Sequence, residues 1–149
     1  MVVGGLLPTA TPEKNGFVDK KYAPLNIRNG DSNIRFVKIG TSPTPAIVDT
    51  SVSKLCLLVS GGNNYGDSLN RDYVYVVNMS ARGRITLDVS TILLGHPDFG
   101  YVINGNMVEW WIKLPTWSSP ISFFPLLNVG FTLSLESRLD EPSGIVYFT

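Results

Sequence analysis

Residues 55–89 read LCLLVSGGNNYGDSLNRDYVYVVNMSARGRITLDV, which is a series of apolar runs separated by breaks rich in glycine and polar residues. Apolar runs of about four to eight residues between such breaks are typical of β-strands, because β-branched and aromatic side chains fill a pleated surface. The stretch therefore predicts strand, loop, strand, turn and strand. Its first loop, residues 61–71, is long for a hairpin connection, and long loops often carry binding sites.

The run at residues 72–80 is apolar on both faces, with Tyr73, Tyr75, Val77 and Met79 on one and Val74 and Val76 on the other. A strand of this kind is covered on both sides, either within the fold or against a partner subunit. The next run, residues 84–89, alternates cleanly and predicts that its odd-numbered apolar residues point inward.

The rest of the chain continues this pattern. We predict strands at 34–40, 52–60, 99–103, 107–114, 121–127, 130–137 and 144–149, with Pro125 placing its strand at a sheet edge or ending it early. Residues 90–97 predict one helical turn capped by Ser90. Eight or nine short, mostly antiparallel strands, together with 14 glycines and 10 prolines, predict an all-β, jelly-roll-like β-sandwich.

Residues 1–33 differ from the remainder in their frequent Gly and Pro breaks. We interpret them as an irregular N-terminal linker or arm, with a single helical turn at 17–22, ahead of a β-sandwich head domain at 34–149. The alternative is that they form a segment covering the edge of that domain.

Charge and hydropathy exclude several classes of protein. Twelve basic residues balance twelve acidic ones, so there is no electrostatic footprint for nucleic acid. No apolar window approaches the roughly 20 residues that cross a bilayer, and the N-terminus lacks the features of a signal peptide. We expect a soluble protein without membrane insertion. Cys56 cannot form an internal disulfide, because it is the single cysteine, and we expect it to be a small buried hydrophobe.

Signatures of catalysis are sparse. The chain has no GxSxG, no phosphate-binding glycine loop and no HExxH, and its single histidine, His96, does not support a multi-histidine metal site. We therefore expect no catalytic residues, metal or cofactor. The residues leave two enzymatic alternatives, a Cys56–His96 dyad and a glycoside-hydrolysing carboxylate pair formed by Asp98 and Glu109.

Aromatic residues without an obvious inward face indicate a binding site instead. Aromatic rings beside amide groups suit saccharides, which they bind by stacking and hydrogen bonding. The alternative for each ring is packing in the core or in a subunit interface. The candidate ligand-binding residues are Trp117, Tyr65, Trp111, Tyr101, Asn63 and Asn64.

Two parts of the chain resemble phage and prophage tail fibre proteins. Residues 7–23, LPTATPEKNGFVDKKYA, resemble the "ATPxxNGLMS" linker ahead of their distal domains, with Phe17 and Val18 where Leu and Met are usual. Residues 58–89, and FGYVINGNMVEWWIKLP at 99–115, resemble the C-terminal head domain, with its GxGNYG-like loop, its "RxTYxVxxSxRG" strand and its hairpin ending in "xVEVWxKxP".

This resemblance implies a jelly-roll-like head, commonly a homotrimer, at the tip of a tail fibre or baseplate. It further implies non-catalytic attachment to a host receptor, of which a cell-surface carbohydrate is our expectation, and contact with other tail or baseplate subunits through the arm. The protein would be made in the bacterial cytoplasm and located in the virion tail. The alternatives are a lectin-like or TNF/C1q-like trimeric adhesion module of a cell, and a glycan-degrading enzyme.

Overall fold

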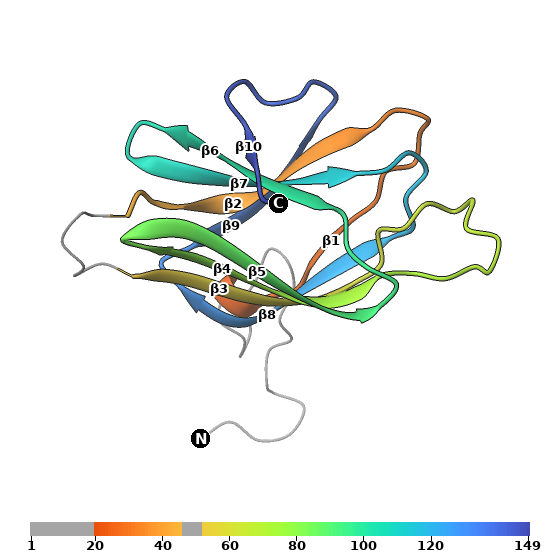
Figure 1. Ribbon diagram of the computed structural model, residues 1–149, viewed down its shortest axis with the longest axis horizontal. Helices are drawn as coiled ribbons and strands as arrows, with labels where there is room; N and C mark the ends of the chain where they lie inside the picture. Colours follow the sequence, from red (N-terminus) through yellow and green to blue (C-terminus); the bar gives the residue numbers. More distant parts are fainter. Residues whose placement is uncertain (1–19, 46–51) are drawn as a thin grey trace, which may run out of the picture.

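The computed structural model describes residues 20–45 and 52–149, which form two five-stranded antiparallel sheets packed face to face (Figure 1). The first, sheet A, contains in spatial order β1 (Leu25–Ile27), β8 (Ile121–Val129), β3 (Ser53–Ser60), β4 (Val74–Arg82) and β5 (Arg84–Leu93). The second, sheet B, contains β10 (Val146–Tyr147), β6 (Asp98–Asn104), β7 (Met107–Leu114), β2 (Arg35–Pro43) and β9 (Thr132–Arg138). The predicted all-β sandwich is confirmed.

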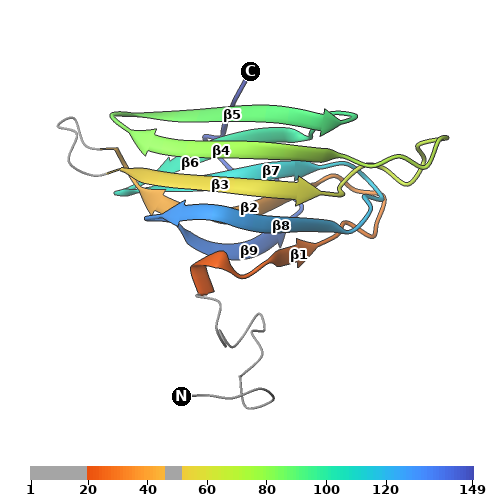
Figure 2. The same ribbon diagram turned by 90° about the horizontal axis from the view of Figure 1, so that it is seen from below.

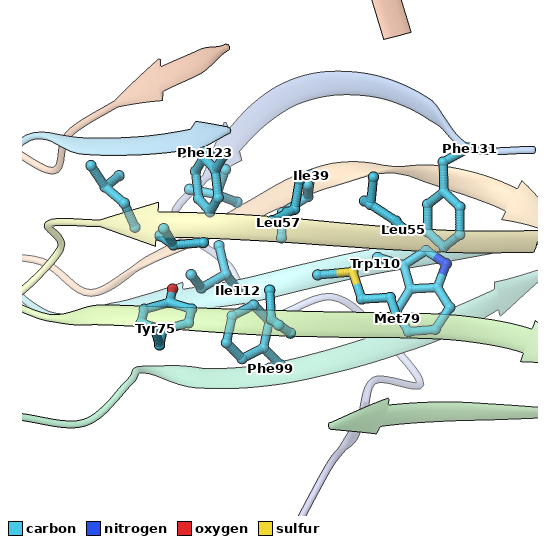
Figure 3. Close-up of a cluster of buried hydrophobic side chains, with 14 of the residues drawn as sticks. Ile39, Leu55, Leu57, Tyr75, Met79, Phe99, Trp110, Ile112, Phe123 and Phe131 are labelled. Carbon is cyan, nitrogen blue, oxygen red and sulfur yellow. The ribbon is translucent and has the colours of Figure 1, made fainter. Parts of the chain in front are cut away.

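The hydrophobic core lies between the sheets, where side chains from both inner faces meet (Figure 3). As predicted, β6 and β7 form a hairpin, with Gly105 at a φ of 60° in its turn. The Trp110 ring of β7 stacks on Phe148 with ring centroids 5.9 Å apart, and its Nε1 donates a hydrogen bond of 2.9 Å to Ser42 Oγ. The predicted apolar face of β7 is fully buried and consists of Val108, Trp110, Ile112 and Leu114.

The predicted helical turn at residues 90–97 is wrong, because β5 continues to Leu93. Ser90 and Thr91 pair with Val76 and Tyr75 of β4 and therefore extend the ladder instead of capping a helix. β-branched residues such as Thr91 and Ile92 favour the extended conformation, and the neighbouring strand supplies partners for their backbone groups.

The predicted exposure of Trp111 is also wrong, since its side chain is only 3% exposed on the outer face of sheet B. Its partner on β6 is Gly100, which has no side chain, and Ile145 lies over this glycine. On the other side its partner is Lys38, which is held by an ion pair of 2.8 Å to Glu136. The strands on both sides of Trp111, and Ile145 beyond its glycine partner, thus come from segments distant in the sequence.

Pro125 lies in β8 beyond the part of that strand that β1 pairs, since the β1 register ends at Phe123. The prediction that Pro125 places its strand at a sheet edge or ends it early is nevertheless wrong, because β8 lies between β1 and β3 and continues to Val129. At Pro125 itself, β8 pairs with Leu57 of β3. On the other side, β8 pairs with β3 through an irregularity between Cys56 and Leu57. Cys56 is half-buried on the outer face, not in the core, and desolvation raises the pKa of its thiol.

Of the predicted arm, residues 1–19 lie outside the described residues. Its described part begins with the 3-10 turn η2 (Lys20–Tyr22), and β1 then pairs with β8 at the edge of sheet A. Asn128 Nδ2 of β8 donates a hydrogen bond of 3.1 Å to the Lys21 carbonyl. The domain boundary at residue 33 stays a prediction. Within residues 20–45 and 52–149, no helix is long and apolar enough to cross a bilayer.

Candidate ligand-binding end of the sandwich

The two ends of the sandwich differ in their connections (Figure 1). At one end, β4–β5, β6–β7 and β8–β9 are joined by tight turns at Gly83, Gly105 and Gly130, each with positive φ. The connection between β2 and β3 also starts and finishes at this end, and its residues 46–51 lie outside the described residues. At the opposite end lie the connections 28–34, 61–73, 94–97 and 115–120, which we call the loop end. Because binding residues are found preferentially on loops held by a rigid scaffold, the loop end is the candidate site.

A buried polar pair fixes the loop end. Asn29 and Ser118, which are 2% and 0% exposed, are joined by a hydrogen bond of 2.9 Å from the Asn29 backbone N–H to Ser118 Oγ. The Asn29 Nδ2 donates to the carbonyls of Asn33 and Pro115, at 2.6 and 2.9 Å. Buried polar groups that are satisfied in this way give rigidity, because breaking one bond leaves an unpaired group in a low dielectric.

The loop after β3, residues 61–73, is held against the segment 115–120, which contains Ser118. Its Gly61 has a φ of 106°, and a Cβ there would lie 2.0 Å from the Pro120 carbonyl oxygen. The neighbouring Gly62 donates from its backbone N–H to Ser119 Oγ at 2.9 Å, and this hydroxyl donates to Asp72 Oδ2. The close approach of the two loops therefore requires glycine at position 61.

Asn63 and Asn64 lie in this loop, and their side chains build it. Asn63 Nδ2 donates to the Arg71 carbonyl at 3.0 Å, and Asn64 Nδ2 donates to the Thr116 carbonyl at 2.5 Å. Asn64 Oδ1 accepts from the Gly66 backbone N–H. The structure thus shows both amides as supports of the residues around them, and the contact of these amides with a ligand stays a prediction.

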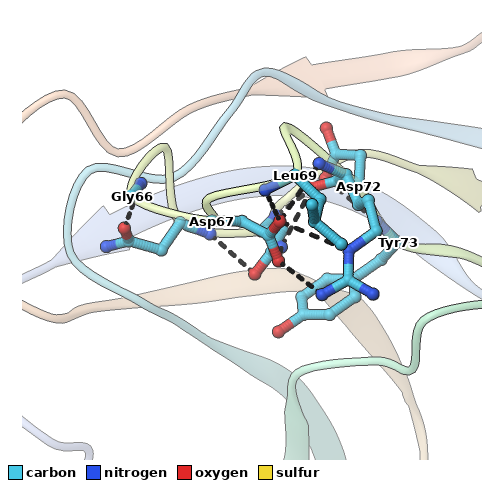
Figure 4. Close-up of polar contacts among 8 residues, drawn as sticks. Gly66, Asp67, Leu69, Asp72 and Tyr73 are labelled. Atoms are coloured by element: carbon cyan, nitrogen blue, oxygen red, sulfur yellow. Dashed lines mark hydrogen bonds and ion pairs between the residues drawn. The ribbon is translucent and has the colours of Figure 1, made fainter.

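An ion pair closes the far part of this loop (Figure 4). Asp67 Oδ2 and Arg71 Nη2 are 3.2 Å apart, and Asp67 Oδ1 accepts from the Leu69 backbone N–H at 3.0 Å. The hydrogen bond from Arg71 and its positive charge hold the pKa of the Asp67 carboxyl below its ordinary value. Both charges of this pair are therefore engaged with each other.

The backbones of Trp117 and Tyr65 are bonded to each other at the loop end. The Tyr65 backbone N–H donates to the Trp117 carbonyl at 2.9 Å, next to the isolated bridge between Asn64 and Ser118. The Trp117 N–H donates to the Asp31 carbonyl, also at 2.9 Å. Both aromatic side chains are exposed, Trp117 by 48% and Tyr65 by 51%.

The backbone of Trp117 is unusual, because its φ is 49°. A bulky residue in the left-handed region is an outlier that costs about 1–3 kcal/mol and persists only where the surroundings impose it. The two backbone hydrogen bonds of Trp117 supply that constraint. Strain of this kind is concentrated at functional sites.

Arg28 completes the exposed cluster. Its guanidinium carbon lies 5.9 Å from the centre of the Tyr65 ring, within the range of a cation–π interaction. Sequence reasoning found Tyr65 and Trp117 but missed Arg28, Asn29 and Ser118. These three occur in turn-like segments where such residues are ordinary, and no local signal marks them.

The structure places the other predicted aromatic residues elsewhere. Tyr101 packs toward the core, with its ring 5.3 Å from that of Phe148. Trp111 is buried on sheet B, as described above. The predicted ligand-binding aromatics therefore divide into a pair at the loop end and a pair that packs within the domain.

The geometry disfavours both enzymatic alternatives. Asp98 pairs with Lys113, four residues along β7 from Glu109, which is about 13 Å of strand. A glycoside-hydrolysing pair needs about 5–10 Å. His96 packs near Tyr75 and Phe99, whereas Cys56 lies on the outer face of sheet A, paired with Asn78. No cluster of metal-ligating side chains occurs in the described parts of the chain.

The fold and the loop end define a class, an antiparallel β-sandwich with two exposed aromatic side chains on loops that are joined by hydrogen bonds. No protein-family model matches the sequence, and no curated protein is similar to it in sequence. A solved structure, Pantoea stewartii WceF, is similar in fold with a TM-score of 0.53 and 13% identity. It is described as a glycan biofilm modifying enzyme with a bacteriophage tailspike-like parallel beta-helix fold.

The match covers 83% of this chain and 21% of WceF, so the chain spans about a fifth of the length of that protein. The two antiparallel sheets described here are not a parallel β-helix, and the similarity therefore concerns a limited part of WceF. It supports the sandwich fold.

Proposed function

We propose that this protein is the head of a phage or prophage tail fibre or tail tip, and that it attaches to the host cell by binding a surface carbohydrate without cleaving it. The observation that carries the proposal is the half-exposed, left-handed Trp117 beside Tyr65 at the loop end. Two aromatic faces on a rigid frame suit the stacking of sugar rings. The resemblance to tail fibre sequences, and the fold shared with part of a tailspike-like protein, support the phage context.

The direction of the chain agrees with this role. The first described residues, in η2, lie against Asn128 near the end of β8, at the end of the sandwich with the tight turns (Figure 2). The loop end is the opposite one. A head attached through its N-terminal arm to other tail or baseplate subunits would therefore present Tyr65 and Trp117 away from the tail.

Homotrimer formation is part of the proposal, and the outer face of sheet A supports it. This face carries apolar side chains at aligned positions of neighbouring strands, since Phe124 pairs with Leu58 and Leu58 with Val76. Phe124 and Leu127 are 41% exposed in the single chain. Packing this face between copies would give the predicted second cover for β4, and it would place several loop ends side by side, which raises avidity.

Light scattering tests the assembly, with a mass near three times 16.3 kDa expected. Phe124→Asp should lower that mass, because it places a charge on the proposed interface, while Ile103→Asp, at an exposed position of sheet B, should leave it unchanged. A monomer at micromolar concentration would contradict the trimer.

A glycan array of bacterial surface polysaccharides tests the binding. The wild-type protein is expected to bind a subset of glycans, and Trp117→Ala and Tyr65→Ala to lose that binding by about tenfold or more, the effect of removing one stacking ring. Ile103→Ala, which removes an exposed apolar side chain at the opposite end, is the matched control.

Prolonged incubation of each bound glycan should release no new reducing ends. Release of reducing ends that persists in a Glu109→Gln variant would show cleavage by another residue. Wild-type binding that survives both aromatic substitutions would refute the loop end as the site.

A further inference from the structure

We propose that the glycan recognised at the loop end is acidic, and that Arg28 binds the carboxylate of a uronic or related sugar acid whose ring stacks on the neighbouring aromatics. This inference rests on the proposed function and names the class of ligand for the same site. It follows from which of the charged side chains around Tyr65 and Trp117 have an ion-pair partner and which do not.

Arg28 differs from the other arginines of the loop end. Arg35 is paired with Asp31 at 2.5 Å, and Arg71 with Asp67 at 3.2 Å. No carboxylate within residues 20–45 and 52–149 forms an ion pair with Arg28, whose side chain is exposed and lies over the Tyr65 ring. Its guanidinium donors therefore remain available to an incoming acceptor.

The carboxylates nearby are engaged elsewhere. Asp31 also accepts a hydrogen bond of 2.8 Å from the Asn33 backbone N–H in addition to its ion pair. Asp72 accepts from the backbone N–H groups of Asn63 and Tyr73 at 2.9 and 3.0 Å, and from the Ser119 hydroxyl. Asp31 is therefore ion-paired with Arg35, and both carboxylate oxygens of Asp72 are held by neutral donors, so neither carboxylate is the ion-pair partner of Arg28.

Arg28 is also well positioned. It precedes Asn29, whose backbone is bonded to the buried Ser118, and Ser118 follows Trp117 in the chain. Tyr65 is bonded to Trp117 through their backbones. One rigid structure therefore presents the cation and both rings.

The chemistry of a uronic acid fits this arrangement. Its carboxylate lies at the edge of the pyranose ring, so that one face of the ring can stack on an aromatic side chain while the carboxylate reaches a guanidinium beside that aromatic. The planar fork of arginine binds a carboxylate through two parallel hydrogen bonds. A neutral sugar would leave these donors without a charged partner.

The test compares acidic glycans with their own carboxyl-reduced forms. Polygalacturonate, alginate, hyaluronan and polysialic acid are presented in both forms, beside neutral and phosphate-bearing bacterial glycans. The wild-type protein is expected to bind at least one acidic glycan about 10- to 100-fold more tightly than its reduced form, as for hydrogen bonds to a charged group. Arg28→Gln should bind both forms with equal affinity, and Arg28→Lys should be intermediate, because it keeps the charge and loses the fork.

Arg84→Gln, at the exposed tight turn of the opposite end, is the matched control and should keep the preference. Unchanged thermal unfolding of Arg28→Gln verifies that the variant is folded. Equal wild-type binding to acidic and reduced forms, a preference that survives in Arg28→Gln, or binding restricted to neutral or phosphate-bearing glycans would each overturn the inference. In these cases, loss of binding in Trp117→Ala would show that the proposed function stands. Absence of binding to every glycan would overturn both.

Discussion

Replacing Trp117 by glycine should leave the protein more stable than replacing it by alanine, which is the reverse of the order at an ordinary exposed position. Both substitutions remove the same ring, so the difference between them reports on the backbone alone. A left-handed conformation costs a residue with a Cβ about 1–2 kcal/mol relative to glycine. Glycine loses about 0.4–1 kcal/mol through the entropy of the unfolded chain. The glycine variant should therefore be ahead by about 0.8 kcal/mol.

Urea and thermal unfolding, followed by far-ultraviolet circular dichroism, measure this difference. For a chain of 149 residues, it corresponds to a melting temperature about 2 °C higher for Trp117→Gly than for Trp117→Ala. The control pair is Ser68→Gly and Ser68→Ala, at an exposed loop position without positive φ, where alanine should be the more stable. An alanine variant at 117 that equals or exceeds the glycine variant would refute a left-handed backbone imposed by the loops.

Further substitutions test the core, the buried network and the surface charges. Trp110→Ala should reduce the free energy of unfolding by about 3–5 kcal/mol, because its fully buried ring leaves a cavity; a loss below 1 kcal/mol in urea unfolding would contradict its core position. Asn29→Ala should cost about 1–3 kcal/mol and also weaken glycan binding, since it removes the donor that joins the carbonyls of Asn33 and Pro115 and thereby releases the loops. Calorimetry measures the loss of stability and the array the loss of binding, and unchanged binding would show that the hydrogen bonds of Asn29 do not support the site. Because Arg71 lowers the folded-state pKa of Asp67 below 3.8, the stabilisation is present above that value and lost as the pH falls through the folded pKa. The urea midpoint of the wild type should thus fall more between about pH 5 and about pH 2.5 than that of Asp67→Asn, and equal falls would show that the pair contributes nothing.

Much of the fold could be predicted from local patterns. The alternation of Val108, Trp110, Ile112 and Leu114 placed these side chains in the core, and the Asn-Gly-Asn sequence located the β6–β7 turn. The errors arose where distant segments decide the outcome. Ser90 and Thr91 have the composition of a helix start, but β4 offers them a ladder; Trp111 lies among charges in the sequence, but Ile145 lies over the neighbouring glycine.

The candidate site could be predicted only in part. Exposed aromatics in Gly/Asn-rich and Ser/Pro-rich loops indicated Tyr65 and Trp117 individually, but their contact depends on the packing of the loops. Asn29 and Ser118 are 89 positions apart, and only the folded backbone makes them partners. The positive φ of Trp117 has no sequence signal, because tryptophan is not a residue that favours it.

The loop end has two parts. The first, which we call the frame, is the hydrogen-bonded structure around the buried bond between Asn29 and Ser118, and the second, the tip, consists of the exposed side chains that the frame carries. The frame is satisfied within itself, so exposed positions such as Ser68 and Leu69 can be exchanged without disturbing it. If the loop end binds a host glycan as proposed, substitutions at these exposed positions change the target at little expense to folding. Under the proposed attachment role, selection for a new host would then accumulate changes at exposed positions such as Ser68 and Leu69, while Asn29 and Ser118 stay constant. The same division makes this loop a natural place for a randomised library.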